Sequence, residues 1–157
     1  VVADGSSAQQ LARDIIAHVG LTPRQEQAVK TFEAQLRAEG VSPARVTSRV
    51  QRYREAQLRY RGEVIARTEL LRAANAGHQE GWNQAVQAGH LIPNEWRKVW
   101  YVTNDDRLDT TICEKIPYLD QNKNVPINGQ FTAPIVGLVS YPPVHPLCRC
   151  VVSIVRK

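Results

Sequence analysis

The sequence lacks several features that would place it in a specialised class. No apolar run approaches the roughly 18 residues that a membrane span needs, which excludes a transmembrane helix. The first residues, Val1-Val2-Ala3-Asp4, include no methionine, basic segment or apolar core, so we expect a processed or trimmed N-terminus rather than a secretory precursor. Cysteine is scarce and odd in number, with three residues in 157, which favours folding in a reducing compartment over a disulfide-built secreted domain.

The composition that remains is typical of one globular domain, alone or with a helical annex: 43% of the residues are hydrophobic and 22% are charged. The excess positive charge is concentrated, because residues 45–72 contain eight arginines, no lysine and three glutamates, while the remainder is neutral. Arginine pairs in a bidentate manner with carboxylates and phosphates. The segment is therefore either a solvated helix face with ion pairs or a contact surface for nucleic-acid phosphates. The candidate contact residues are Arg45, Arg49, Arg52, Arg54, Arg59 and Arg61.

Capping signals predict about four helices in the first half of the chain. Ser6 or Ser7 can cap the first helix, and Thr22-Pro23-Arg24-Gln25 supplies an N-cap, a proline at the first helical position and a capping-box glutamine for the second. The first and second expected helices end at Gly20 and at Gly40, and the third and fourth cover about 44–60 and 63–88.

The second half has a different composition. Seven of the nine prolines fall between residues 93 and 146, and the helical period disappears. Residues 97–103 and 150–155 are rich in β-formers and are expected to pair as antiparallel strands, with a short strand or turn at 125–127. Helices followed by a small antiparallel sheet with long Pro-rich loops predict an α+β fold. We expect a helical docking region over 1–62 and an α+β domain over 63–157.

The most specific local motif is His145-Pro146-Leu147-Cys148-Arg149-Cys150. With Cys113 it offers three thiols and one imidazole, the ligand types and number of a closed tetrahedral zinc site. Such a metal would link two segments of a region in which few hydrogen bonds between strands are expected. Three interpretations stay open: a structural zinc, free or buried thiols that pack as small hydrophobes, and a disulfide from Cys113 to one of the other two. A catalytic Cys–His pair is disfavoured, because no third group is evident to orient the base.

Two further groups of polar residues have ordinary structural explanations. Arg67 and Glu69 lie about 200° apart on a helix, so they cannot pair with each other, and each is expected in an ion pair with another residue, commonly a buried one. Asp105, Asp106 and Asp109 are expected to be exposed loop residues that cap a short helix around 110–115, rather than metal or acid–base groups.

In order along the chain, these features resemble the Mu F-like minor head proteins of tailed phages. The likeness rests on Gly20–Gln25, Ile65-Ala66-Arg67-Thr68-Glu69 with Asn75 and Gly77, a Trp-containing strand leading into Asp105-Asp106-Arg107, and the closing Pro142-Pro143-x-His145-Pro146-x-Cys148-Arg149-Cys150. One departure concerns the metal ligands. Many relatives have a Cys or His soon after the D-D-R and another further on, whereas this chain has only Cys113 as an upstream ligand.

The resemblance implies a structural minor capsid or head morphogenesis protein, not an enzyme. It implies a location inside the head near the portal vertex, after assembly in the host cytoplasm. The implied partners are the portal protein, the major capsid or scaffold protein, and phage DNA during packaging or delivery, with no membrane contact. Within the family motif, Arg67, Thr68, Glu69 and Asn75 are implied to be structural. The alternative function is a nucleic-acid-binding module that uses the Arg-rich helix 45–72.

Overall fold

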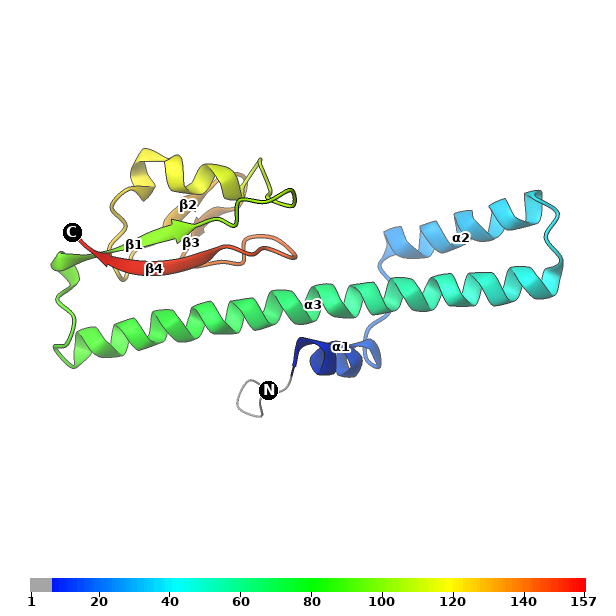
Figure 1. Cartoon of the computed structure of the whole chain (residues 1–157), viewed down its shortest axis with the longest axis horizontal. Helices are drawn as coiled ribbons and strands as arrows, with labels where there is room; N and C mark the ends of the chain where they lie inside the picture. Colours follow the sequence, from blue (N-terminus) through cyan, green and yellow to red (C-terminus); the bar gives the residue numbers. More distant parts are fainter. Residues whose placement is uncertain (1–6) are drawn as a thin grey trace. The chain divides into compact units, whose positions relative to one another are not determined.

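The computed structural model describes residues 7–157 and has an α+β architecture, as the sequence predicted (Figure 1). Helices come first and two small antiparallel sheets follow. The chain divides into two compact units, one up to Arg67 and one over Thr68–Lys157. The sequence-based boundary at 62/63 lies five residues earlier. The elements are α1 (Ala8–Ile16), α2 (Pro23–Ala38), α3 (Pro43–Gln87), β1 (Trp96–Tyr101), β2 (Phe131–Ala133), β3 (Gly137–Val139), β4 (Val151–Arg156) and the 3₁₀ helices η1 (Pro93–Glu95), η2 (Cys113–Tyr118) and η3 (Asp120–Asn122).

The first unit contains the capped helices that the sequence indicated. The Ser7 hydroxyl accepts a hydrogen bond from the Gln10 N–H at 3.2 Å and caps α1, whereas Ser6 lies outside the described residues. The capping box of Thr22 and Gln25 is present at the start of α2. Helix α1 ends at Ile16, earlier than the expected stop at Gly20. None of the helices within residues 7–157 combines the length and the hydropathy that a membrane crossing requires.

The expected third and fourth helices form one continuous helix, α3. The sequence pattern predicts a break near Gly62, but the glycine lies within the helix and serves close packing. A Cβ at this position would lie 2.6 Å from Cγ1 of Ile16 and 3.0 Å from the carbonyl oxygen of Ala12. The absence of a side chain at Gly62 therefore lets α1 approach α3. Because glycine has a low helix propensity, the sequence pattern around Gly62 resembles a helix end.

A Gly62→Ala substitution is therefore expected to destabilise the first unit by about 1–3 kcal/mol, because the added methyl group overlaps the Ile16 side chain and is pressed against the Ala12 carbonyl oxygen. Urea unfolding followed by far-UV circular dichroism measures the change. Gly77→Ala is the matched control on the same helix. Its Cβ would meet no atom within 4 Å, so alanine should stabilise the helix by up to about 1 kcal/mol. Equal stabilisation by both substitutions would contradict the packing role of Gly62.

The second unit is built on the strand pair that the sequence predicted. Strands β1 and β4 are antiparallel and lie side by side, with Trp96 opposite Arg156 and Tyr101 opposite Val151 (Figure 1). The expected short strand near 125 is a single bridge between Lys98 and Val125. The β2–β3 hairpin was not predicted. The core contains Trp100, Phe131, Ile116 and the three cysteines, and the second part of α3 packs Leu71 and Trp82 against it.

Lys98 is fully buried in this unit, which the sequence did not indicate. Its ammonium donates to Oε1 of Gln79 at 3.0 Å and to the carbonyl oxygen of Ser140 at 2.9 Å, and it lies 5.4 Å from the ring centroid of Phe131. Burial lowers the pKa of Lys98 from 10.5 to about 8. The lysine thus joins α3, β1 and the segment after β3 through neutral acceptors and an aromatic face.

Candidate metal centre

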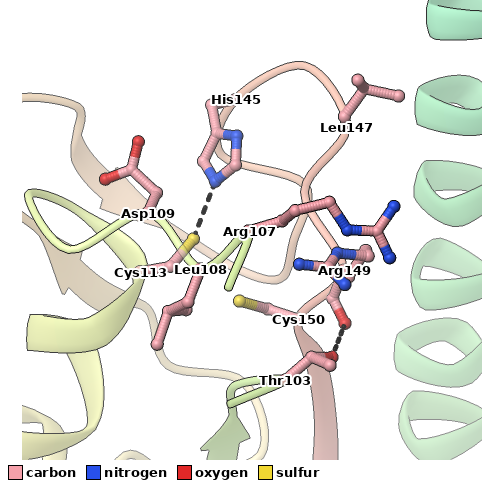
Figure 2. Close-up of a pocket in the computed structure, with 9 residues that line it drawn as sticks. All are labelled: Thr103, Arg107, Leu108, Asp109, Cys113, His145, Leu147, Arg149 and Cys150. Carbon is pink, nitrogen blue, oxygen red and sulfur yellow. Dashed lines mark hydrogen bonds between the residues drawn. The ribbon is translucent and has the colours of Figure 1, made fainter. Parts of the chain in front are cut away.

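The candidate ligands come from two segments that are far apart in the sequence. Cys113 begins η2, and His145, Cys148 and Cys150 belong to the loop that leads into β4 (Figure 2). That loop turns sharply: Leu147 has a φ of 58°, and the Cys148 N–H donates to the carbonyl oxygen of His145 at 3.2 Å. The turn brings both cysteines of the C-x-C motif to the same side rather than to opposite faces of a strand.

The three sulfur atoms form a compact, buried group. Cys113, Cys148 and Cys150 are 1%, 4% and 2% exposed, and their Sγ atoms all lie within 4.8 Å of one another. The Cys113 and Cys148 sulfurs are 3.8 Å apart and are not bonded as a disulfide. Two sulfurs about 2.3 Å from a tetrahedral zinc ion are themselves about 3.8 Å apart. The group can therefore hold a metal ion, and its soft thiolate donors suit zinc.

His145 lies beside this group and presents a suitable nitrogen to it. Its Nδ1 is 2.8 Å from the carbonyl oxygen of Pro146, which can only accept, so the ring hydrogen is on Nδ1. In the neutral ring the lone pair is then on Nε2, which lies 3.0 Å from the Cys113 sulfur and can accept from its thiol or bind a metal ion (Figure 2). A backbone carbonyl that fixes the tautomer in this way is the usual partner of a zinc-ligating histidine.

The close approach of three thiols perturbs their ionisation. Hydrogen bonds to Cys148 and Cys150, together with burial, raise the pKa of Cys113, whereas hydrogen bonds from Cys113 and Cys150 lower the pKa of Cys148. For Cys150, the hydrogen bond to Cys113 lowers the pKa, but the one to Cys148 and burial outweigh it and raise the value to about 11.

The loop that carries the ligands is held in place by polar contacts from two other segments, α3 and the residues that follow β1. The Leu147 N–H donates to the Thr68 hydroxyl of α3 at 3.1 Å, and the Thr103 hydroxyl donates to the carbonyl oxygen of Arg149 at 3.1 Å. The Arg149 guanidinium forms a bidentate ion pair with Asp105, which lowers the pKa of that carboxyl to about 2. Three motifs that are separate in the sequence, R-T-E, D-D-R and C-R-C, thus meet at one loop.

Of the three aspartates, Asp109 has a capping role of the expected kind, whereas Asp105 pairs with Arg149 and Asp106 is exposed. Oδ1 of Asp109 accepts hydrogen bonds from the N–H groups of Thr111 and Ile112, at 2.9 and 2.8 Å, and from the Thr111 hydroxyl at 2.8 Å. It caps the turn that leads into η2, which starts at Cys113, slightly later than expected. Asp105 and Asp109 are therefore engaged with the loop and with backbone N–H groups.

The family-motif residues on α3 divide into exposed and buried positions. Arg67 and Glu69 are exposed and lie in loose intrahelical pairs, with Glu63 at 3.9 Å and Arg72 at 3.6 Å, so the expected buried ion pairs are absent from these two positions. Between them, Thr68 is buried against the ligand loop. Asn75 is 3% exposed, and its amide donates to the carbonyl oxygen of Leu71 at 2.9 Å.

The structure separates the candidate arginines of α3 into distinct environments. Arg54 pairs with Glu26, with one contact of 2.9 Å. Arg61 is half-buried and its Nε has no hydrogen-bond partner among residues 7–157, and Arg59 is exposed. The remaining three, Arg45, Arg49 and Arg52, line a groove together with Glu39, Gly40, Val41 and Ser42. None of the three makes an ion pair with any residue from 7 to 157.

Sequence reasoning named the three cysteines that the structure brings together, and the histidine beside Cys113, but it missed the residues that surround them. The contact of Thr68 with Leu147 spans 79 residues, and no local pattern marks it. The sequence marks Trp100 only as a strand residue, although it packs in the same core as the cysteines. Pairing of 97–103 with 150–155, which the sequence did suggest, was the one signal that could have placed Trp100 near Cys150.

Comparisons with known proteins do not add an identification. No family model, no curated protein and no solved structure matches this chain.

Proposed function

We propose that this chain is a structural, portal-associated protein of a tailed-phage head, and that a zinc ion bound by Cys113, His145, Cys148 and Cys150 holds its second unit together. The observation that carries the proposal is the convergence of three buried sulfurs from segments 35 to 37 residues apart, with the His145 Nε2 at 3.0 Å from one of them, the Cys113 sulfur. The resemblance to Mu F-like minor head proteins supplies the biological setting.

The meeting of separate motifs at the ligand loop supports this setting. The residues behind the resemblance are scattered from Thr68 to Cys150, yet Thr68, Asp105 and Arg149 all contact or belong to the loop that carries the ligands. A family of proteins that share a fold would retain residues that hold one local structure together. The arrangement favours a rigid assembly module.

The proposed metal explains how the irregular region is stabilised. Residues 104–149 contain only two three-residue strands and two short 3₁₀ helices, so ordering them costs much conformational entropy. A structural zinc contributes on the order of 10 kcal/mol of apparent folding free energy at pH 7. Zinc would supply only this cross-link here, since all four positions of a tetrahedral site are filled by protein ligands.

The geometry disfavours catalysis by the Cys–His pair. A nucleophilic sulfur must be partly accessible to its substrate, whereas Cys113 is 1% exposed. The sulfurs of Cys148 and Cys150 lie within 4.8 Å of the Cys113 sulfur.

Metal analysis of the purified protein, together with co-purification with a portal protein, tests the proposal. We expect one zinc per chain and a complex with the portal that survives size-exclusion chromatography. Absence of both would reject the proposal. Robust hydrolase or transferase turnover that is lost in Cys148→Ala would replace the structural function with an enzymatic one.

A second candidate function, contact with nucleic acid, is favoured by the three arginines of the groove, which have no ion-pair partner within residues 7–157. Arg45, Arg49 and Arg52 follow one another at helical spacings of four and three residues. Arg49 lies 5.8 Å from the ring centroid of Phe32, which holds the guanidinium near the groove. Guanidinium groups without carboxylate partners are available to phosphates.

If these arginines contact phosphates, replacing all three with glutamine should weaken DNA binding to the same extent for every sequence. The slope of log affinity against log salt should fall in magnitude by about 2.7, or roughly 0.9 for each phosphate that is no longer neutralised. Fluorescence anisotropy over a range of salt concentrations measures it. Arg67→Gln with Arg72→Gln is the control, because these residues are exposed but paired with glutamates. Unchanged DNA binding with loss of portal binding would assign the groove to a protein partner.

A further inference from the structure

Trp100 and Cys150 lie close together at the start of the β1–β4 pair. Trp100 is opposite Val152 in the register, and Cys150 directly precedes β4, two residues before Val152. If the alternation of β4 is extended by this one residue, Cys150 is a diagonal neighbour of Trp100 on the same face. Both are buried in the same core, at 3% and 2% exposure. The indole is therefore adjacent to one of the proposed zinc ligands.

The Trp100 ring is held firmly, yet its one polar atom has no standard partner. The ring packs edge to face on Phe131, with centroids 5.2 Å apart and an interplanar angle of 74°. Nε1 is buried and makes no hydrogen bond of normal geometry with any residue from 7 to 157. Buried donors without acceptors are rare in native proteins. An indole N–H can only donate a hydrogen bond, so it needs an acceptor.

The neighbouring sulfur is the acceptor that this N–H can use. A neutral thiol is a weak acceptor, whereas a thiolate is a much stronger one because the hydrogen bond is then charge-assisted. The donor is thus positioned for a sulfur that carries charge, which is the form that a metal ion requires.

We propose that Trp100 is a positioning residue of the metal centre, whose indole N–H donates a hydrogen bond to the Cys150 sulfur when the metal is bound. The inference rests on the proposed zinc site. The hydrogen bond orients the Cys150 side chain and withdraws charge from its sulfur, as outer-sphere donors do in other thiolate sites.

The test compares Trp100→Phe, which keeps an aromatic ring but removes the N–H, with Trp96→Phe on the same strand. Zinc affinity is measured by competition with a chromophoric chelator, and cobalt(II) is used as a spectroscopic probe. Trp100→Phe should bind zinc about 10–100-fold more weakly and shift the sulfur-to-cobalt charge-transfer band, while Trp96→Phe changes neither. Zinc affinity within twofold of the wild type and an unmoved band in Trp100→Phe would overturn the proposal.

A measurement on the wild-type chain keeps the proposal testable if Trp100→Phe does not fold. With ¹⁵N-labelled tryptophan, one indole resonance should move downfield on adding cadmium and show coupling to ¹¹³Cd. Persistence of that resonance in both Trp82→Phe and Trp96→Phe assigns it to Trp100. Cadmium binding without a shifted indole overturns the role of Trp100 alone. Failure of wild-type protein to bind zinc, cobalt or cadmium overturns the zinc site itself.

Discussion

A Cys113→Ser variant is expected to lose its zinc and, with it, the cooperative unfolding transition of the second unit. Cys113 is the only proposed ligand outside the loop 145–150, so its loss removes the cross-link between η2 and that loop. The expected loss, on the order of 10 kcal/mol, is comparable with the total stability of about 5–15 kcal/mol of a typical domain. Thermal unfolding with and without a chelator, alongside zinc analysis, measures both effects.

Val125→Thr provides the control for this experiment. Val125 is 2% exposed in the same core. Threonine replaces one methyl group of valine with a hydroxyl of similar size, and the proposed ligands are left unchanged. The control should retain its zinc and a cooperative transition at a reduced temperature. If the thiols only pack as small hydrophobes, Cys113→Ser should behave like Val125→Thr and the chelator should have no effect on the wild type.

Replacing Asn122 with alanine is expected to destabilise the second unit by about 3–5 kcal/mol. Asn122 is 5% exposed, and its amide donates to the carbonyl oxygens of Ile116 and Thr132, both at 2.8 Å. Its carbonyl accepts from the Thr132 N–H, also at 2.8 Å. The side chain therefore pairs with β2 in the manner of a neighbouring strand, and alanine leaves three buried backbone groups without partners.

Chemical denaturation of zinc-loaded protein measures this loss. Asn124→Ala is the matched control, because Asn124 is exposed and two residues away, and its replacement should change the stability by no more than about 0.5 kcal/mol. Similar midpoints for the two variants would show that water satisfies the groups that Asn122 now contacts.

The parts of the fold that follow from local chemistry were predictable from the sequence. The capping box of Thr22 and Gln25 and the β-formers of β1 and β4 identify their elements within a few residues. Gly62 misled the prediction because its effect on helix propensity is visible in the sequence, whereas the nearby Ala12 carbonyl is not. The β2–β3 hairpin escaped because its turn has Ile135 with a φ of 68°, where a glycine or asparagine would be the usual signal.

The candidate site was predictable in its ligand types but not in its surroundings. Short spacings and soft donor atoms pointed to Cys113, His145, Cys148 and Cys150 as a group. The burial of Lys98 without a carboxylate could not be foreseen, because lysine in a strand is normally exposed or at an edge. Its neutral acceptors, Gln79 and Ser140, lie 19 and 42 residues away.

The pairing of β1 with β4 has a consequence for the order of events during synthesis. Tyr101 cannot find its partner Val151 until fifty further residues have been added, which takes about 2.5–10 s at roughly 5–20 residues per second. Cys148 and Cys150 arrive immediately before that partner strand. Through this interval the β1 edge has no partner strand and Cys113 lacks the two other cysteines of its group, so chaperone protection matters most just before β4 is made.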